Sequence, residues 1–396
     1  MEGMKPNPLR LMLVFGTRPE AIKMAPLVRA LRADPEVEAT VVVTGQHREM
    51  LRQVLDVFGI VPDADLDIMR PRQRVTDVLT RSLNALRPQF ARFRPDMVLV
   101  HGDTTTTLAA SLAAFYAHVP VGHVEAGLRT FDMQAPWPEE MNRRLTAPLA
   151  ELHFAPTPRA AANLEREGIV GGVHITGNTV IDALLGAVRR IEDDVPLATR
   201  LACAFPFIDP ARKLILVTAH RRENFDGGVE AITDALDRIA QRDDVQIVFP
   251  VHPNPRVHDV VEQRLAGHAH IHLVEPQDYL PFVWLMERCT LVLTDSGGIQ
   301  EEAPSLGKPV LVLRDVTERP EAVAAGTVEL VGTDADRIVS RVSRLLDDPT
   351  AYARMAHATN PYGDGAATGR IVQAIKAWWA ARHASGAAEA HAPALT

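Results

Sequence analysis

The chain has few cysteines and no long apolar run, and each shortage excludes a class of protein. Cys203 and Cys289 are the only cysteines among 396 residues, and neither has Cys or His neighbours at ligand spacing. We therefore expect buried, reduced thiols in a cytoplasmic protein and no structural zinc. The first apolar run, residues 9–15, is far shorter than the roughly 20 residues that cross a bilayer. No small-residue cleavage pattern follows it, so the sequence predicts neither a signal peptide nor a membrane span.

An excess of positive charge is also absent. Lys and Arg number 42 against 50 Asp and Glu, a net charge of −8, so we expect no nucleic-acid-binding surface. Hydrophobic residues make up 46% and charged residues 23% of the chain, which excludes disordered and fibrous classes. A chain of this length favours two or three domains, because a single core seldom grows so large. Local groups can still bind a small anion.

Short apolar runs alternate with amphipathic stretches, which is typical of parallel strands joined by helices. Most runs are apolar on both faces, as sheets covered by helices on each side require. The first series of predicted strands is 9–17, 37–45, 96–103, 119–126, 152–157 and 173–177. The second series is 213–220, 245–252, 271–276, 291–295, 309–315 and 327–332. Helices are predicted over 21–31, 50–58, 76–93 and 104–117.

The two series predict two doubly wound, Rossmann-like α/β domains, over 1–190 and 191–365. Residues 191–210 are acidic, contain proline and have no strand pattern, and we interpret them as the linker region. Ligands bind beyond the carboxyl ends of the strands in such sheets, so the ends of both sheets are expected to face one interdomain cleft. The Ala- and His-rich tail, 385–396, has no period and is predicted to be disordered.

Two strand-to-helix junctions are typical of anion binding. The strand 9–17 leads through Gly16 into a helix that carries Arg18 and Lys23 near its start. Bases at a helix N-terminus suit an anion, although a capped helix with solvated bases explains them equally well. The strand 291–295 leads into Ser296, Gly297 and Gly298, whose successive backbone N–H groups can hold a diphosphate. Neither a Walker loop nor a dinucleotide-binding fingerprint is present.

Acidic residues follow several strands of the first series. Asp103 ends one strand, where capping of the next helix is an alternative role. Glu125 ends the following strand and is expected near Asp103 if the two strands are neighbours. Glu139 and Glu140 begin a predicted helix, where favourable interaction with the helix dipole is the alternative. Acidic groups that converge on one cleft suit proton transfer.

Basic and polar residues follow the strands of the second series. His220 stands beside Arg221 at one strand end, which favours a functional role, and His252 ends the next strand. Glu302 lies on the helix after the glycines and is expected to accept hydrogen bonds from ribose hydroxyls. Arg319 follows a later strand and is a candidate for phosphate binding.

These stretches together resemble the bacterial non-hydrolysing UDP-N-acetylglucosamine 2-epimerases, which interconvert UDP-GlcNAc and UDP-ManNAc. The matching motifs span nearly the whole chain, and we find no departure from the family at a motif position. They are 16–27 (GTRPEAIKMAPL), 101–107 (HGDTTTT), 122–130 (GHVEAGLRT), 136–143 (PWPEEMNR), 220–223 (HRRE), 295–322 (DSGGIQEEAPSLGKPVLVLRDVTERPEA) and 360–365 (NPYGDG).

The resemblance implies a GT-B-like fold whose final helix, 366–382, crosses back to the first domain. It implies catalysis by Asp103, Glu125 and Glu139, with His220 near the phosphates. The residues that it implies for UDP binding are Arg18, Lys23, Gln277, Phe282, Ser296, Gly297, Gly298, Glu302 and Arg319. A second, activating UDP-GlcNAc is implied next to the active site, at Gln46, His47, Arg72, Gln73, Arg221 and His252.

The resemblance further implies a homodimer that uses neither a metal nor a redox cofactor and supplies UDP-ManNAc for cell-surface polysaccharide. Elimination of UDP to 2-acetamidoglucal and its re-addition is the mechanism that we expect, because C2 of the sugar is not next to a carbonyl. Three alternatives stay open at this point: a hydrolysing relative that releases free ManNAc and UDP, a glycosyltransferase on the same fold, and a non-enzymatic nucleotide-sugar sensor.

Overall fold

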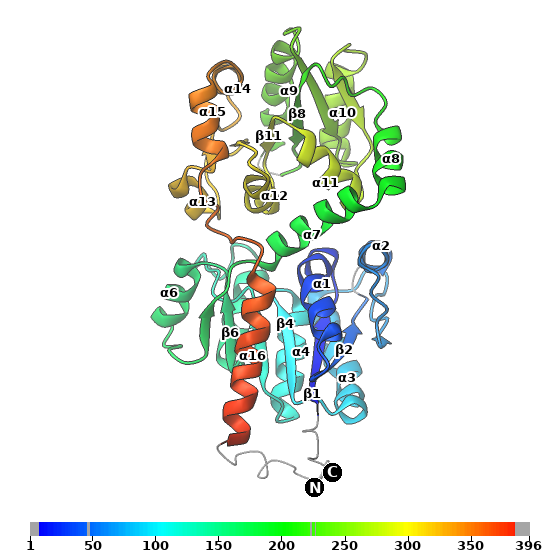
Figure 1. Ribbon diagram of the computed structural model, residues 1–396, viewed down its shortest axis with the longest axis vertical. Coiled ribbons are helices and arrows are strands. Elements are labelled where there is room, and N and C mark those ends of the chain that lie inside the picture. Colours follow the sequence, from blue (N-terminus) through cyan, green and yellow to red (C-terminus); the bar gives the residue numbers. More distant parts are fainter. Residues whose placement is uncertain (1–7, 46–47, 222–223, 226, 385–396) are drawn as a thin grey trace. The chain divides into compact units, whose positions relative to one another are not determined.

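The computed structural model describes residues 8–45, 48–221, 224–225 and 227–384. The described chain forms two compact units, one running to Ala183 and resuming at Gly363, the other comprising Leu184–Tyr362. Each unit is a parallel sheet between layers of helices (Figure 1). Within the described residues, no helix has both the length and the apolar character needed to cross a membrane. The predicted tail at 385–396 lies outside the described residues.

The sheet of the first unit is wholly parallel, in the order β3-β2-β1-β4-β5-β6-β7. Successive strands are added outward from β1 on one side and from β4 on the other. The junction between β1 and β4 is therefore the topological switch point, where such sheets bind ligands. The strands are β1 (Leu9–Phe15), β2 (Val37–Val43), β3 (Ala64–Asp65), β4 (Met97–His101), β5 (Val121–Val124), β6 (Leu152–Ala155) and β7 (Val173–Ile175).

Alternation along β1 shows how both faces of this sheet are buried. Leu11 and Leu13 contribute to the core beneath α1, α2 and α16, whereas Met12 and Val14 contribute to the core beneath α3 and α4. All four side chains are at most 1% exposed, as a doubly covered parallel strand requires. The helices of this unit are α1 (Arg18–Ala33), α2 (Arg48–Phe58), α3 (Val75–Phe93), α4 (Thr105–Tyr116), α5 (Glu139–Thr146), α6 (Pro158–Arg166) and α16 (Ala367–Ala384).

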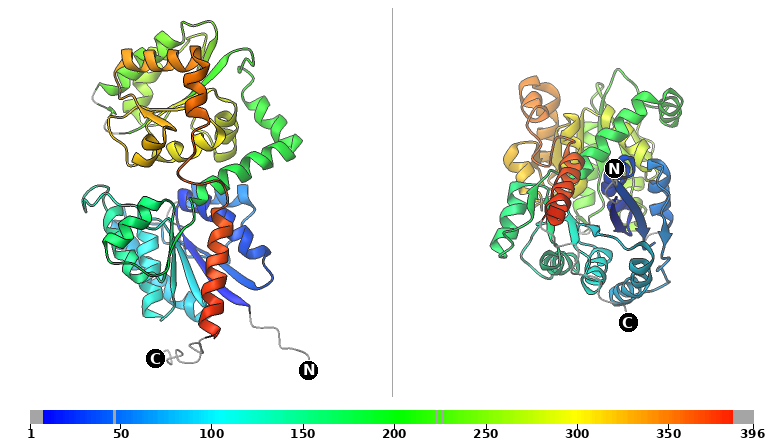
Figure 2. Two further views of the ribbon diagram at one scale, coloured as in Figure 1. Left: turned by 60° about the vertical axis from the view of Figure 1, so that its left-hand side comes forward. Right: turned by 60° about the horizontal axis from the view of Figure 1, so that its bottom comes forward.

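The last helix, α16, packs along the sheet of the first unit although it is the last element of the chain (Figure 2). Ile371 and Ile375 are fully buried in the same core as α1. Asp182, on α7 (Thr179–Asp193), accepts hydrogen bonds from the backbone N–H groups of Ala367 and Thr368 at the start of α16. Burial and this carboxylate at the helix N-terminus hold α16 in place.

The second unit repeats the same sheet order, as β10-β9-β8-β11-β12-β13. Its switch point lies between β8 and β11. The strands are β8 (Lys213–Thr218), β9 (Val245–Pro250), β10 (Ile271–Val274), β11 (Leu291–Thr294), β12 (Val310–Val312) and β13 (Val328–Leu330). The helices are α8 (Val195–Ala204), α9 (Gly228–Ile239), α10 (Pro255–Leu265), α11 (Tyr279–Arg288), α12 (Gly297–Glu302), α13 (Pro320–Ala325), α14 (Ala335–Asp347) and α15 (Pro349–Ala356).

The segment 191–210, interpreted from its sequence as a linker, is mostly helical. It contains the end of α7 and all of α8, and Leu197, Leu201 and Phe205 are buried at four-residue spacing. Cys203 points away from that buried stripe and is exposed, so the prediction of a buried thiol was wrong at this position. Cys289 is buried, as expected. An apolar sequence neighbourhood did not reveal which side of α8 faces the core.

Every predicted strand has a counterpart in the structure. The sequence missed β3, because a strand of two residues has no recognisable pattern.

The turn after β5 shows why glycine is needed beside the expected site. Gly127 has φ 89°, and a Cβ there would lie 2.2 Å from the carbonyl oxygen of Ala160 on α6. Only a residue without a side chain allows this turn to pack so closely against α6.

We expect Gly127→Ala to lower the free energy of unfolding by about 2–4 kcal/mol, because it adds both a strained left-handed conformation and a clash with backbone. Gly171→Ala is the matched control, since a Cβ there has nothing within 4 Å. Urea denaturation of the two variants measures the difference. Equal stabilities would contradict the close packing described here.

Candidate functional site

The carboxyl ends of β4 and β5 bring two predicted acidic residues together. The strands are neighbours, with His101 paired in register with Val124, and Asp103 and Glu125 follow them directly. Oε1 of Glu125 lies 3.5 Å from where a Cβ on Gly102 would stand, so the two loops touch. Glu125 was expected near Asp103 if their two strands are neighbours, and β4 and β5 are neighbours.

Glu125 is held in an unusual backbone conformation. Its φ is 62°, in the left-handed region that non-glycine residues seldom adopt. Its carboxylate forms an ion pair with Lys23 of α1 and accepts a 2.7 Å hydrogen bond from Nδ2 of Asn178. Such strain persists only where surrounding contacts impose it, and it clusters at functional sites. Lys23, expected to bind an anionic ligand, here has the Glu125 carboxylate as its anion.

Asp103 has a carboxyl group whose protonation is shifted toward neutral pH. Burial raises its pKa to about 6, and the negative charges of Glu125 and Glu139 add to this rise against the opposing effect of Arg143. Nη1 of Arg143 lies 3.5 Å from Oδ2 of Asp103, and Asn142 donates to the Asp103 carbonyl oxygen at 2.9 Å. The side chain is 32% exposed, so a ligand can reach it. A carboxyl group with this pKa can both take and give a proton near neutral pH.

The adjacent glutamates at the start of α5 have different surroundings. Glu140 is fully buried and accepts hydrogen bonds from the backbone N–H groups of Thr130 and Phe131 and from Nε of Arg143 at 2.6 Å. Burial alone would raise the pKa of Glu140, but these donors lower it below the ordinary value. Glu139 is only half-buried, and its charge acts on Asp103. Glu140 thus holds the loop, and Glu139 is the member of the pair near the other acids.

Sequence reasoning missed Glu20, which joins the two sides of the first switch point. One carboxylate oxygen accepts from the backbone N–H groups of Gly16 and Thr17 after β1, and the other accepts from Oγ1 of Thr104 after β4. Glu20 is buried, and this burial raises its pKa. Thr17 and Glu20 also form a capping box, a pattern that the sequence contains and that could have indicated Glu20. Arg18, the first residue of α1, is half-buried beside it.

In the second unit, the helix start after β11 is surrounded by guanidinium groups. Ser296 is the N-cap of α12, and Gly297 and Gly298 form its first turn. A Cβ on Gly297 would lie 3.7 Å from the Arg319 guanidinium and 3.9 Å from Nη2 of Arg221. Backbone N–H groups and two guanidinium groups at one place suit a diphosphate.

Arg319 is held by a buried carboxylate. Glu301, one residue before the predicted Glu302, forms an ion pair with Nε of Arg319 and is 1% exposed. The backbone N–H of Arg319 donates to Oγ1 of Thr317. Oε1 of Glu302 lies 3.6 Å from where a Cβ on Gly298 would stand, so this carboxylate is beside the helix start. Glu301 therefore orients Arg319.

His220 follows β8 and faces Asp295, which follows β11. Nδ1 of His220 lies 3.1 Å from Oδ1 of Asp295. The ring of His252, after β9, stacks on that of His220 with centroids 5.6 Å apart and planes 16° apart. Burial, followed by the nearby His220, lowers the pKa of His252. These three residues bring the ends of three adjacent strands into one cluster.

Gln277 and Phe282, both predicted to bind UDP, follow β10 in the chain. Gln277 follows β10, an edge strand separated from β11 by β9 and β8, and its Nε2 donates to the Glu275 carbonyl oxygen at 2.6 Å. Phe282 is half-buried in the first turn of α11. The sheet order places Gln277 on the far side of β8 from Ser296, whereas α11, which carries Phe282, packs against β8 and against the turn Ala303–Leu306 that follows α12.

The residues predicted for an activating ligand are divided between the units. Gln46 and His47 lie outside the described residues, as do Arg222 and Glu223 of the histidine motif. Arg72 is exposed with φ 57°, and Oε1 of Gln73 accepts from the backbone N–H of Arg70, all in the loop before α3. Arg221 and His252 belong to the second unit, beside His220.

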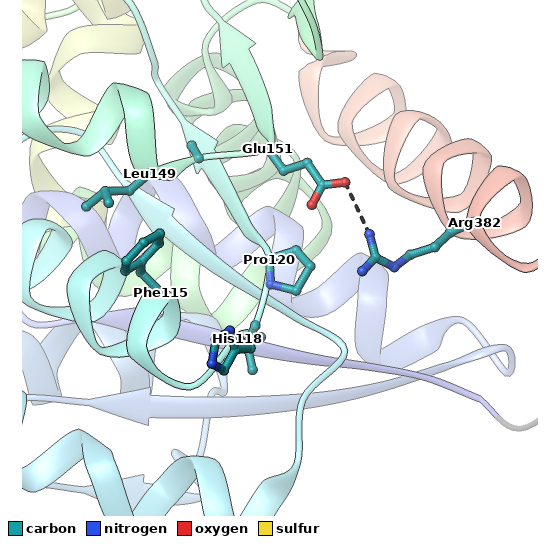
Figure 3. Close-up of a pocket in the computed structure, with 8 residues that line it drawn as sticks. Phe115, His118, Pro120, Leu149, Glu151 and Arg382 are labelled. Carbon is teal, nitrogen blue, oxygen red and sulfur yellow. Dashed lines mark hydrogen bonds and ion pairs between the residues drawn. The ribbon is translucent and has the colours of Figure 1, made fainter. Parts of the chain in front are cut away.

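The first unit also has a surface hollow (Figure 3). Its lining comes from the end of α4, the residues just before β5 and β6, and α16, so it lies at the amino-terminal edge of the sheet. Asp103 and Glu125 follow the opposite, carboxyl-terminal edge. The lining residues are Phe115, His118, Val119, Pro120, Leu149, Ala150, Glu151 and Arg382.

Among the residues described, no group of three or more His, Cys, Asp or Glu is arranged to hold a metal ion.

Two doubly wound units, each with its polar side chains gathered at the carboxyl ends of a parallel sheet, define a GT-B-like α/β protein. The same fold is found in sucrose-phosphate synthase from Thermosynechococcus elongatus, with a TM-score of 0.62 over 94% of this chain and all of that one. Only 14% of residues are identical in that comparison, so it shows the fold alone.

Sequence comparison identifies the family. The family model described as UDP-N-acetylglucosamine 2-epimerase matches residues 29–376. The Escherichia coli K12 enzyme of that name is 60% identical over 371 residues, which cover 93% of this chain and 98% of the relative. The crystal structure of UDP-GlcNAc 2-epimerase from Neisseria meningitidis bound to UDP-GlcNAc has a TM-score of 0.86 at 50% identity, covering 93% of this chain and all of that one. The chain belongs to the UDP-N-acetylglucosamine 2-epimerase family, which confirms the resemblance stated from its motifs.

The raised pKa of Asp103 predicts that its ionisation opposes folding. The folded protein keeps a proton on Asp103 between about pH 4 and about pH 6 that the unfolded chain releases, so stability falls as pH rises through this window. At pH 7.5 we expect Asp103→Asn to be more stable than the wild type by about 1 kcal/mol, a value discounted for exposure, and the gain to vanish near pH 4.

Chemical denaturation at both pH values measures this difference. Asp96→Asn is the control with the opposite sign, because Asp96 accepts hydrogen bonds from the backbone and guanidinium of Arg10 and its removal should destabilise. An Asp103→Asn variant with the same stability change at both pH values would contradict the raised pKa.

Proposed function

We propose that the protein interconverts UDP-GlcNAc and UDP-ManNAc by inverting C2 of the sugar, without hydrolysis. The observation that carries the proposal is the contact between the loops of Asp103 and Glu125, with the pKa of Asp103 raised to about 6. Family membership and the cationic helix start at Gly297 support it. Carboxyl groups that exchange protons near neutral pH are what inversion at a carbon centre requires.

The proposed reaction is elimination followed by addition. A carboxylate takes the C2 proton, the C–H electron pair forms the C1–C2 double bond of 2-acetamidoglucal, and UDP leaves in an anti elimination with the electron pair of the C1–O bond. In the syn addition that follows, a carboxyl group gives its proton to the opposite face of C2, the π pair of the C1–C2 double bond forms the new C2–H bond, and a UDP oxygen forms the C1–O bond with its own electron pair. Every atom is conserved, and the reaction as written uses neither a metal nor a redox cofactor.

The proposal divides the chemistry between the two units. Asp103, Glu125 and Glu139 exchange protons with the sugar, and two carboxyl groups serve the two faces of C2. Arg319 and the N–H groups after Ser296 stabilise the diphosphate as it leaves, the kind of prearranged electrostatics that often dominates catalysis. His220 supplies a proton or a positive charge at the phosphates. The remaining UDP contacts are those that the family resemblance implies, namely Arg18, Lys23, Gln277, Phe282, Gly297, Gly298 and Glu302.

We also propose the wider setting from the resemblance. The enzyme is a cytoplasmic homodimer that supplies UDP-ManNAc for cell-surface polysaccharide. A second UDP-GlcNAc activates it through Gln46, His47, Arg72, Gln73, Arg221 and His252. The stacking of His252 on His220 supports this, because a ligand at His252 would touch a residue of the proposed catalytic set.

Proton NMR of UDP-GlcNAc with the pure protein in heavy water tests the reaction. We expect UDP-ManNAc carrying deuterium at C2, and positional exchange of 18-oxygen at the UDP bridge, because the proton and UDP both leave. Retention of the original C2 hydrogen would contradict elimination. Free ManNAc and UDP would identify a hydrolysing enzyme, a new glycoside with an added acceptor would identify a transferase, and binding without reaction would identify a sensor.

Replacing a catalytic carboxyl group by the corresponding amide should stop turnover without preventing binding. We expect Asp103→Asn and Glu125→Gln to lower kcat by about 10²- to 10⁴-fold, the usual contribution of a general acid or base. The affinity for UDP, measured by calorimetry, should stay within a few-fold. Glu165→Gln is the control, because Glu165 is exposed on α6. Full activity in the Asp103 and Glu125 variants would exclude these carboxylates from proton transfer.

A further inference from the structure

One carboxylate in the second unit has different surroundings at each of its two oxygens. Asp295 is fully buried. Its Oδ2 accepts three hydrogen bonds, from the backbone N–H of His220 at 2.7 Å, from that of Arg221 at 2.8 Å and from Nδ2 of Asn224 at 3.2 Å. The two backbone N–H groups can only donate, so whatever atom occupies the Oδ2 position must be an acceptor.

The other oxygen faces the ring of His220 as a close charge contact. Oδ1 lies 3.1 Å from Nδ1 of His220, and an ionised carboxylate can only accept. Burial alone would raise the pKa of Asp295, but the contact with His220 and the backbone donors of Arg221 and His220 lower it, which keeps the carboxylate ionised. The hydrogen of a neutral His220 is then on Nδ1, and Nε2 has the lone pair.

We infer that Asp295 is a positioning residue that selects the Nδ1–H tautomer of His220 and fixes the backbone that carries Arg221. The inference rests on the proposed function, in which His220 acts at the diphosphate. A proton taken up on Nε2 makes an imidazolium whose charge Asp295 balances from the Nδ1 side. Nε2 gives that proton to a diphosphate oxygen as the C1–O bond breaks, and takes it back when UDP re-adds.

The geometry makes a sharp prediction for Asp295→Asn. Three N–H donors at the Oδ2 position admit only the amide oxygen, so the amide NH₂ must take the place of Oδ1 and donate to Nδ1 of His220. A neutral His220 is then forced to carry its hydrogen on Nε2. The same substitution in a Ser-His-Asp triad selects the wrong tautomer and lowers kcat by about 10⁴-fold.

Nitrogen-15 NMR of the full chain labelled in histidine, recorded at alkaline pH where the imidazole is neutral, reports the tautomer directly. We expect Nδ1–H in the wild type and Nε2–H in Asp295→Asn. The kcat for epimerisation should fall by at least about 10²-fold, by analogy with the triad, while UDP affinity changes by less than about tenfold. A purely structural role would not reverse the tautomer.

Asn224→Ala is the matched control, because it removes one donor to Oδ2 and leaves the contact between Oδ1 and Nδ1 in place. It should keep the Nδ1–H tautomer. The inference is overturned if the wild type shows Nε2–H, if Asp295→Asn keeps Nδ1–H, or if Asn224→Ala reverses the tautomer as well. The wild-type spectrum decides even if Asp295→Asn fails to fold. A wild type that shows Nδ1–H but does not epimerise would refute the proposed function and leave the tautomer assignment standing.

Discussion

A buried carboxylate at each topological switch point is the constraint on which both candidate sites depend. Glu20 accepts hydrogen bonds from Gly16 and Thr17, which follow β1, and from Thr104, which follows β4. Asp295 follows β11 and binds the loop after β8. A buried anion is stable only where several donors surround it, so each carboxylate fixes the loops that supply those donors. Asp103, His220 and Arg221 project from the loops held in this way.

The two sites use charge in opposite ways. In the first unit, burial raises the pKa of Asp103 toward neutral, and the negative charges of Glu125 and Glu139 add to the rise. In the second unit, Arg221 and Arg319 crowd positive charge beside a helix start. The first arrangement suits proton exchange with carbon, and the second suits stabilisation of a leaving diphosphate.

Patterns along the chain predicted the strands well because strands buried on both faces are continuous apolar runs. The same patterns did not show which side of a helix faces the core. Cys203 is exposed although its neighbours are apolar, and Leu201, two residues earlier, is buried. The adjacent acids at Glu139 and Glu140 likewise could not be told apart by the residue pattern, although the family resemblance singled out Glu139, since only the surrounding N–H donors make Glu140 a buried structural anion.

The sequence by itself determined the alternation of strands and helices, the polar residues at the strand ends and the family, because these are properties of local order and of motif spacing. Only the tertiary structure decided which of those residues meet. The neighbouring positions of β4 and β5 join Asp103 to Glu125, and those of β8 and β11 join His220 to Asp295. Strand order is a property of the whole core, since it depends on which helices cover which face, and no local pattern encodes it. The pKa of a buried group and the hydrogen position of an imidazole follow from that packing.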